Sequence, residues 1–348
     1  MKVGILGYAG VGKTTVFSAL TGKAPGVNIP GEVHRATVEV ADTRLEKLRD
    51  VYQPRKYTPA RFEVEDLVPL PQGEVKGRGE VLNSLREPEA LLIVLGLFEQ
   101  ARMVLPGALG SARAQLQSVR DDLLLLDMEL VEKRVGRIED RLRRGGGDRE
   151  GLRRELQFVQ ILQTALEEGT PLPETDDRRT ALMYTEMRLF QHKPTVIVVN
   201  VDEGKAGDAA ELEAEAHLEA LCAPVEVDIA ELEGDDRQSF LDEYGLAEPA
   251  GARLTRSAYQ ALDLISFFTV GEDEVRAWPI VRGSDAVTSA GKIHSDLARG
   301  FIRAEVTPFE LVKDAADIRE FKAATQAELK GKDYVVEDGD ILNIRFSV

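Results

Sequence analysis

Eight consecutive residues near the start of the chain have the spacing of a phosphate-binding loop. They are Gly7-Tyr8-Ala9-Gly10-Val11-Gly12-Lys13-Thr14. Glycines let a loop curl so that successive backbone N–H groups point inward, and a following helix adds its positive N-terminal end. The lysine would then reach the β- and γ-phosphates of a nucleotide, and the threonine hydroxyl would contact Mg²⁺. The residues expected to bind the nucleotide here are Gly7, Gly10, Val11, Gly12, Lys13, Thr14 and Thr15.

A second candidate site follows a later apolar run, where Thr195–Asn200 leads into Val201-Asp202-Glu203. GTP-binding proteins often carry Asn-Lys-x-Asp at this place, and the short carboxylate accepts two hydrogen bonds from guanine. Here Glu203 is longer and Val201 replaces the lysine, so selectivity for guanine is in doubt. Asn200, Val201 and Glu203 are the candidates for base contact, and both ATP and GTP stay open. The alternative is that Asn200 only ends a strand in a turn.

The elements that must hold these residues can be read from apolar periodicity. The segment 2–7 is typical of a short buried strand, and 13–21 of a helix that ends at Gly22. Apolar runs at 61–68, 90–97 and 195–200 predict further strands of a covered parallel sheet. The expected fold is therefore α/β, built around the phosphate loop.

Two amphipathic stretches predict an antiparallel helical arm inserted between two strands. Apolar residues recur at 124, 128, 131, 135, 138 and 142, and again at 152, 156, 159, 162 and 166, on either side of three glycines at 145–147. Alternating steps of three and four are typical of a coiled-coil seam. Between Lys133 and Arg154 nine basic residues face four acidic ones. This surplus indicates either a solvated helical surface or a face that contacts nucleic acid.

The last eighty residues differ in pattern. Short β-like runs at 274–280, 301–306, 334–336 and 342–346 alternate with turns rich in Gly, Asp and Pro. They predict a small separate α+β domain.

Composition limits the class of protein. The chain has 348 residues, a formal net charge of −17 and one cysteine, Cys222. A single cysteine excludes an intramolecular disulfide framework, and no apolar run is long enough for a membrane span. The start is too short an apolar stretch for a secretory signal, so we expect a cytoplasmic protein that contacts no membrane. The acidic balance argues against a protein coated all over with nucleic acid, and we expect no recognition of DNA sequence.

The chain resembles the YchF/Obg-like ATPase family along nearly its whole length. The resemblance is carried by Gly7–Thr15, by Asn-x-x-Glu at 200–203 after the inserted hairpin, and by five C-terminal segments at 268–271, 274–278, 290–296, 300–306 and 331–340. It implies a GTPase-type domain with relaxed or ATP-preferring base choice (1–112 and 191–266), a coiled-coil arm (113–190), and a β-grasp-like TGS domain (267–348). It also implies Mg²⁺ as cofactor and association with the ribosome or its RNA.

Several positions depart from the family pattern. Gly10 replaces the usual asparagine, which is a mild change because glycine only frees the turn. In the second switch, Asp66 would still bind Mg²⁺ through water, but Pro69 has no N–H to give to the γ-phosphate, and Leu70 keeps the family's hydrophobic residue. The first switch is shortened to 31–36. Thr37, directly after it, is the candidate to replace the family's metal-binding threonine.

Three hypotheses about activity follow. The first is a slow ATPase or GTPase in which Lys13 stabilises transition-state charge, with no general base that the sequence identifies. The second is a nucleotide-binding scaffold with impaired hydrolysis that acts through its arm and TGS domain, which the two altered switches favour. The third is a small-molecule phosphotransferase, the weakest because no acceptor-site pattern accompanies the loop.

Overall fold

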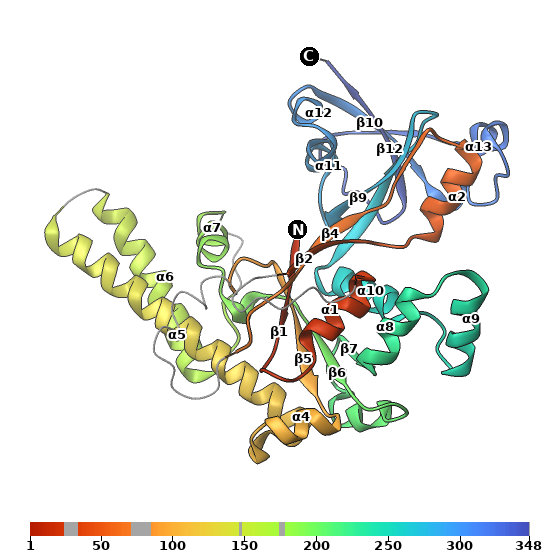
Figure 1. Cartoon of the computed structure of the whole chain (residues 1–348). Coiled ribbons are helices and arrows are strands. Elements are labelled where there is room, and N and C mark those ends of the chain that lie inside the picture. Colours follow the sequence, from red (N-terminus) through yellow and green to blue (C-terminus); the bar gives the residue numbers. More distant parts are fainter. Residues whose placement is uncertain (24–33, 71–84, 146–147, 174–177, 348) are drawn as a thin grey trace. The chain divides into compact units, whose positions relative to one another are not determined.

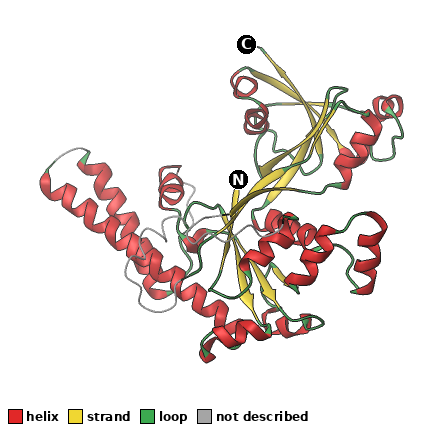
Figure 2. Ribbon diagram, viewed as in Figure 1, coloured by secondary structure: helices red, strands yellow, loops and turns green. Residues whose placement is uncertain are grey.

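The computed structural model describes residues 1–23, 34–70, 85–145, 148–173 and 178–347. They form two compact units. The first comprises Met1–Ala19, Lys23–Arg35 and Glu65–Glu231, and the second Leu20–Gly22, Ala36–Val64 and Leu232–Val348. Figure 1 labels the elements, and Figure 2 separates helices from strands.

The strands are β1 (Lys2–Leu6), β2 (His34–Glu39), β3 (Lys56–Thr58), β4 (Arg61–Asp66), β5 (Ala90–Gly96), β6 (Thr195–Asn200), β7 (Leu218–Leu221), β8 (Leu264–Thr269), β9 (Glu274–Val281), β10 (Phe301–Pro308), β11 (Glu328–Lys330) and β12 (Asp340–Phe346). The α-helices are α1 (Lys13–Thr21), α2 (Thr43–Tyr52), α4 (Glu99–Val104), α5 (Ala112–Arg144), α6 (Arg149–Glu168), α7 (Arg178–Met187), α8 (Ala223–Glu231), α9 (Gly234–Glu243), α10 (Ala250–Ala261), α11 (Ala286–Ile293), α12 (Ser295–Arg299) and α13 (Ile318–Ala324). The 3₁₀ turns are η1 (Gly107–Leu109), η2 (Phe190–His192), η3 (Ala206–Leu212) and η4 (Phe309–Leu311).

The sheet that carries the phosphate loop has the order β2-β4-β1-β5-β6-β7. Within the first unit, β5 pairs in parallel with β1 and with β6, and β6 pairs in parallel with β7. Every residue of β5 is buried, as expected of a strand covered on both faces. The α/β fold class is thus confirmed. The predicted strands at 2–7, 61–68 and 90–97 are each one or two residues shorter, whereas 195–200 and the helix 13–21 have the predicted bounds.

The helical arm is also confirmed. Ser111 caps α5 through its hydroxyl, which accepts from Ala114 N, and Asp148 caps α6 in the same way through Gly151 N. All the predicted seam residues belong to one apolar cluster between the two helices, which run side by side in Figure 1. Helix α5 begins at Ala112, twelve residues before the seam, because its first turns pack on β5 instead of on α6.

The second unit is built on a sheet with the order β11-β10-β12-β8-β9-β3. Strands β9, β10 and β12 match predicted runs. The run at 334–336 is not a strand, and this prediction was wrong: Val335 makes only an isolated bridge to Asp285. The carboxylate of Asp340 accepts hydrogen bonds from the Tyr334 hydroxyl and from Glu337 N, which fold this segment into a turn.

Two features of this sheet were not predicted. Strand β3, from the segment after the first switch, pairs in parallel with β9 and belongs to this sheet. The predicted domain boundary at residue 267 falls inside β8. The division into three domains stays a prediction. No helix in the described ranges is long and apolar enough to cross a membrane.

Candidate functional site

The glycine-rich loop connects the end of β1 to the start of α1. Its glycines Gly7, Gly10 and Gly12 have φ angles of 156°, 84° and 87°, which side-chain-bearing residues rarely adopt. Space is also closed at all three, since an added Cβ would lie 2.5 Å from the Val94 carbonyl oxygen at Gly7, 2.6 Å from Val104 Cγ2 at Gly10 and 2.3 Å from Asn200 Nδ2 at Gly12.

Lys13 is the first residue of α1 and is only 7% exposed. Its ammonium group donates to the carbonyl oxygen of Tyr8, 3.3 Å away within the loop. Burial lowers the pKa of Lys13, and the nearby carboxylate of Asp66 opposes that shift. An ammonium group buried against a carbonyl gains when a negatively charged group enters beside it. The loop is therefore suited to an anion.

Thr14 and Asp66 lie together as expected of two groups that share a metal ion. The Thr14 hydroxyl donates to Asp66 Oδ2 at 2.6 Å, and Asp66 is 7% exposed. The other carboxylate oxygen, Oδ1, is buried and has no hydrogen-bond partner among the described residues. A buried carboxylate oxygen left in this state fits a hydrated Mg²⁺, which takes few protein ligands beside phosphates and water. No group of three or more His, Cys, Asp or Glu side chains in the described part of the chain could hold a metal.

The residues expected to contact the base have three different environments. Asn200 is 3% exposed, and its amide is used within the protein: Nδ2 donates to Val11 O at 3.2 Å, and Oδ1 accepts from Ala223 N at 3.0 Å. Val201 is buried at 2% exposure, whereas Glu203 is exposed in the turn after β6. The structure thus brings Asn200 to the phosphate loop, and it leaves only Glu203 free to reach a base from solvent.

The second switch runs alongside β1. Leu67 N donates to Ile5 O at 3.1 Å, and Leu70 N donates to Gly7 O at 3.0 Å, so Leu70 pairs with Tyr8 as an isolated parallel bridge. Leu70 is 2% exposed, whereas Pro69 is exposed. The N–H of Leu70 is therefore already bound to Gly7 O, and Pro69 has no backbone N–H to donate.

Residues 31–33, half of the shortened first switch at 31–36, lie outside the described residues. Thr37, the suggested substitute for its metal-binding threonine, is an exposed residue of β2. On β2 its neighbours Ala36 and Val38 are buried, so Thr37 alternates outward as a strand residue does. Its role at a metal ion stays a prediction.

Tyr8 is a loop residue whose side chain was not predicted to matter. It is 2% exposed, and its hydroxyl lies 2.7 Å from Ser118 Oγ and 3.0 Å from Asp122 Oδ2, both on α5. Gln115 was missed as well. Its buried side chain accepts from Gly96 N and donates to Gly96 O at 2.8 Å. A signal for Tyr8 was available, because a tyrosine in a buried loop needs a partner for its hydroxyl.

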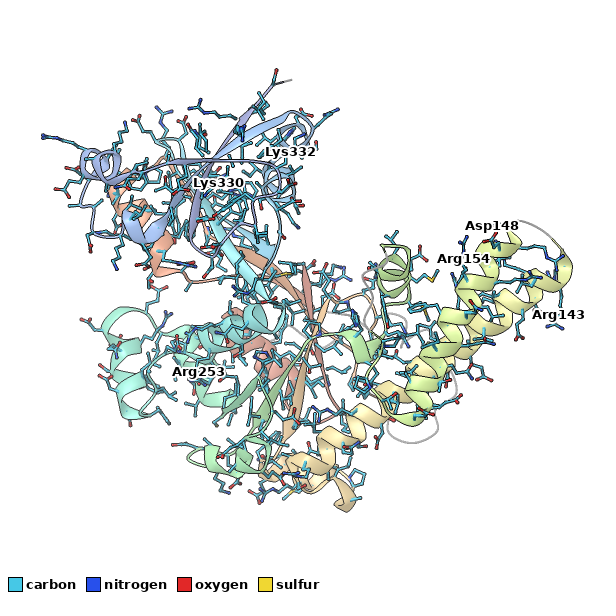
Figure 3. All side chains as sticks on the ribbon, turned by 180° about the vertical axis from the view of Figure 1, so that it is seen from behind. Arg143, Asp148, Arg154, Arg253, Lys330 and Lys332 are labelled. Carbon is cyan, nitrogen blue, oxygen red and sulfur yellow. The ribbon has the colours of Figure 1, made fainter. Side chains whose placement is uncertain are left out.

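The basic part of the arm carries its charge on the surface. Of its nine basic residues, Lys133, Arg134, Arg143 and Arg154 make ion pairs with acids of the same arm. Within the described part of the chain the others make none. Four arginines, Arg134, Arg137, Arg141 and Arg144, follow one another at steps of three and four and line a hollow of about 300 Å³. We call these four residues the arginine stripe. Figure 3 shows the end of the arm, where Arg143 and Arg154 are labelled.

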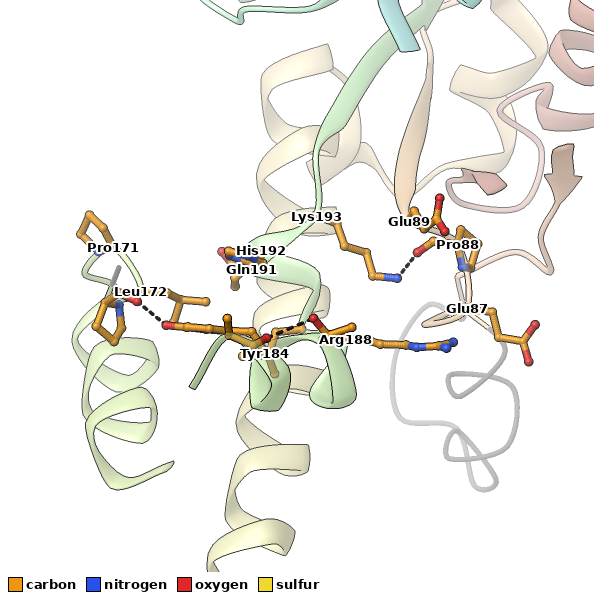
Figure 4. Close-up of a pocket in the computed structure, with 14 residues that line it drawn as sticks. Glu87, Pro88, Glu89, Pro171, Leu172, Tyr184, Arg188, Gln191, His192 and Lys193 are labelled. Carbon is orange, nitrogen blue, oxygen red and sulfur yellow. Dashed lines mark hydrogen bonds between the residues drawn. The ribbon is translucent and has the colours of Figure 1, made fainter. Parts of the chain in front are cut away.

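A larger hollow, about 930 Å³, lies at the opposite edge of the sheet (Figure 4). It is lined by residues just before β5 (Glu87–Glu89) and just before β6 (Gln191–Lys193), together with Tyr184 and Arg188. Ligands of open parallel sheets bind at the carboxyl ends of the strands, where the phosphate loop and Asn200 lie. The larger hollow lies at the amino ends of β5 and β6, where such ligands do not usually bind. The phosphate loop therefore remains the candidate site.

Comparison with known proteins identifies the family. The family model YchF-GTPase_C, described as a protein of unknown function (DUF933), matches residues 264–347. A protein of Bacillus subtilis named ribosome-binding ATPase YchF is 33% identical over 367 residues, covering 100% of both chains. The protein of that name from Escherichia coli O157:H7 is 33% identical over 365 residues, covering 100% of this chain and 99% of the relative. The structure of the Schizosaccharomyces pombe YchF GTPase superposes with a TM-score of 0.79 at 26% identity, covering 99% of this chain and 97% of that one. With this identity over its full length, the chain belongs to the YchF family.

Proposed function

We propose that this chain binds ATP or GTP with Mg²⁺, hydrolyses it slowly, and associates with the ribosome in the cytoplasm. The observation that carries the proposal is the loop at 7–13. Three left-handed glycines turn its backbone, and the buried ammonium group of Lys13 donates its hydrogen bond to a neutral carbonyl oxygen instead of a carboxylate. The names of the relatives, ribosome-binding ATPases, support the same activity.

The chemistry would be electrostatic. The loop amides and the start of α1 would hold the phosphates, and Lys13 would exchange the Tyr8 carbonyl for a phosphate oxygen. Thr14 and Asp66 would hold Mg²⁺, which would neutralise the charge that develops on the phosphates. A water molecule would attack in line. The described residues include no side chain to which we assign the role of general base.

Nucleotide titration with a matched lysine control tests this proposal. The affinity for ATP, GTP, ADP and GDP is measured with and without Mg²⁺, and phosphate release is followed with and without ribosomes. Lys13→Ala should lower triphosphate affinity and turnover at least tenfold, about the loss of one strong charged contact. Lys313→Ala, which removes an exposed lysine paired with Glu310, should change neither. Equal affinities in wild type and Lys13→Ala would end the assignment.

The arm is the surface that we propose for ribosomal RNA. Acidic side chains are concentrated elsewhere: between 202 and 248 the chain has sixteen Asp or Glu and two Lys or Arg. That segment would repel a polyanion. The arginine stripe would attract one, and from Arg137 to Arg144 it extends about 10 Å along the helix, a length that spans about three phosphates of one strand. The C-terminal unit, which we propose to be a TGS domain, would add a second contact.

Salt dependence distinguishes phosphate contacts from a solvated surface. Replacing Arg137, Arg141 and Arg144 with Gln should reduce the slope of log affinity against log salt by about 2 to 3, since each phosphate contact contributes about 0.7 to 0.9. The control replaces Arg102, Arg113 and Arg120 with Gln, which changes net charge equally but removes arginines whose side chains are bound to Asp208, to the Glu211 carbonyl oxygen and to Glu215. An equal slope in both triple variants would return the stripe to the class of solvated surfaces.

A second function is favoured by the second switch. Pro69 has no backbone N–H, and the N–H of Leu70 is bound to Gly7 O. This segment therefore has no free backbone N–H at 69 or 70 to donate to a γ-phosphate. The chain would then be a nucleotide-binding scaffold without useful hydrolysis. Similar affinity for di- and triphosphates, with no Mg²⁺-dependent phosphate release on ribosomes, would favour the scaffold over the hydrolase.

A further inference from the structure

Tyr8 joins the phosphate loop to the helix that forms the arm. Its hydroxyl lies between Ser118 Oγ and Asp122 Oδ2, at 2.7 and 3.0 Å, and these two residues are one turn apart on α5. Burial raises the pKa of Tyr8 to about 12. The phenol therefore keeps its proton at neutral pH and donates a hydrogen bond to the carboxylate of Asp122. Ser118 can give a second hydrogen bond to the same oxygen. We call this group the tyrosine clasp.

The backbone at Tyr8 contacts Lys13 directly and the second switch through the neighbouring Gly7 carbonyl. The Tyr8 carbonyl oxygen accepts from Lys13 Nζ, and Tyr8 pairs with Leu70 of the second switch in a parallel bridge. A triphosphate that engages Lys13 removes the donor from the Tyr8 carbonyl. A triphosphate that moves the second switch breaks or tightens the bridge. Either change acts on the residue whose side chain holds α5.

Helix α5 can carry such a change to the arm because it is continuous. It runs from Ala112 to Arg144 without a break, and the clasp at 118 and 122 directly precedes the seam that begins at Leu124. Other bonds hold the same part of the helix to β5, through Gln115 and Gly96, and to the turn before β5, through Asp127 and Arg86. The helix is thus fixed to β5 at 115, to the turn before β5 at 127, and to the phosphate loop between these two points.

We propose that Tyr8 is a positioning residue that couples nucleotide occupancy of the phosphate loop to the ribosome affinity of the arm. The inference rests on the proposed function, because it needs both ligands. Two ligands are coupled only when each interacts differently with the states that the other favours, and the coupling factor is the same in both directions. The tyrosine clasp supplies the differing contact.

The test is a thermodynamic cycle on the full-length protein. Ribosome affinity is measured without nucleotide and with a non-hydrolysable ATP or GTP analogue, and analogue affinity is measured with and without ribosomes. In wild type the two ratios should agree and differ from one by about fivefold or more. In Asp122→Asn the ratio should fall toward one, while each ligand alone binds within about twofold of wild type, and Tyr8→Phe should lower the ratio in the same way.

Tyr334→Phe is the matched control, since it removes a phenol-to-carboxylate hydrogen bond of 2.8 Å to Asp340 away from the loop. It should keep the wild-type ratio. Hydrogen exchange of α5 gives an independent readout: nucleotide should alter exchange around Ser118–Asp122 in wild type and not in Tyr8→Phe. If wild type binds both ligands but the ratio is one, or is unchanged in Tyr8→Phe and Asp122→Asn, the coupling is refuted and the proposed function stands. If wild type binds no nucleotide, the proposed function itself fails.

Discussion

The side-chain nitrogen of Asn200 donates a hydrogen bond to the carbonyl oxygen of Val11, 3.2 Å away inside the phosphate loop. Because its oxygen accepts from Ala223 N as well, the amide fixes the loop to the end of β6 and the start of α8. Asn200→Ala leaves both buried partners unpaired, at about 1 to 3 kcal/mol each. We expect the free energy of unfolding to fall by about 2 to 6 kcal/mol and the affinities for ATP and GTP to fall by a common factor. A selective loss of GTP binding would show that Asn200 reads the base.

Base preference should instead respond to Glu203. This residue is exposed after β6, and its side chain is one methylene longer than the aspartate of guanine-binding relatives. Glu203→Asp shortens the reach of the two acceptor oxygens, so the ratio of GTP to ATP affinity should rise about tenfold. Glu213→Asp, the same change at another exposed position, should leave the ratio unchanged. Competition between the two nucleotides for a fluorescent analogue measures it, and an unchanged ratio in Glu203→Asp would place base recognition elsewhere.

Periodic and glycine-dependent features could be predicted from sequence because they are local. The left-handed glycines of the loop, the bounds of α1 and the seam between α5 and α6 each follow from residue types a few positions apart. Thr14 and Asp66 were each predicted to serve Mg²⁺; the structure places the two side chains in contact, and their role at the metal stays a prediction.

Contacts between distant residues could not be predicted in this way. Tyr8 meets Asp122 across 114 positions, and β3 pairs with β9 across more than 200. Such pairs depend on how the strands are ordered, which periodicity does not encode. The segment 334–336 has the composition of a strand, but the carboxylate of Asp340 binds it as a turn. Asn200 was predicted to contact the base, which stays a prediction; its partners in the structure are the loop carbonyl and an amide of α8.

A buried ion pair at the base of the arm should matter more than an exposed one. Asp127 is fully buried and pairs with Arg86 at 2.6 Å, and burial raises the pKa of Asp127 despite that partner. Arg86→Met leaves the carboxylate without its cation, so the free energy of unfolding should fall by about 3 to 5 kcal/mol. Arg143→Met, which breaks a pair with Asp140 at the surface, should cost about 1 kcal/mol or less. Urea denaturation followed by circular dichroism gives both values, and similar losses would contradict the argument.

The arm also contains a glycine that no contact requires. Gly136 lies inside α5, and an added Cβ would meet no atom within 4 Å. Glycine inside a helix costs about 0.5 to 1 kcal/mol relative to alanine, so Gly136→Ala should stabilise the arm by that amount. Slower hydrogen exchange of α5 would report it. Gly145→Ala is the contrasting variant, because Gly145 has a φ of 74° where it ends α5, and it should destabilise the same helix.

Stability should rise with pH through the titration of Lys193. Its ammonium donates to the Arg86 carbonyl at 2.6 Å, and burial, together with Arg86 and Arg188, lowers its pKa from 10.5 to about 8. Between these values the unfolded chain binds more protons than the folded one, so the free energy of unfolding increases as pH rises. From pH 8 to 9.5 the gain from this group should be about 1 kcal/mol, because partial exposure reduces it.

Comparison with Lys193→Met isolates the effect of Lys193. Other groups titrate in this range, among them Cys222, whose pKa burial raises and whose contribution has the opposite sign. They are common to both proteins, so the difference between the two stability profiles reports Lys193. We expect the profile of Lys193→Met to rise less between pH 8 and 9.5 than that of wild type. Parallel profiles would show that the Lys193 ammonium titrates in the folded protein as it does in the unfolded chain.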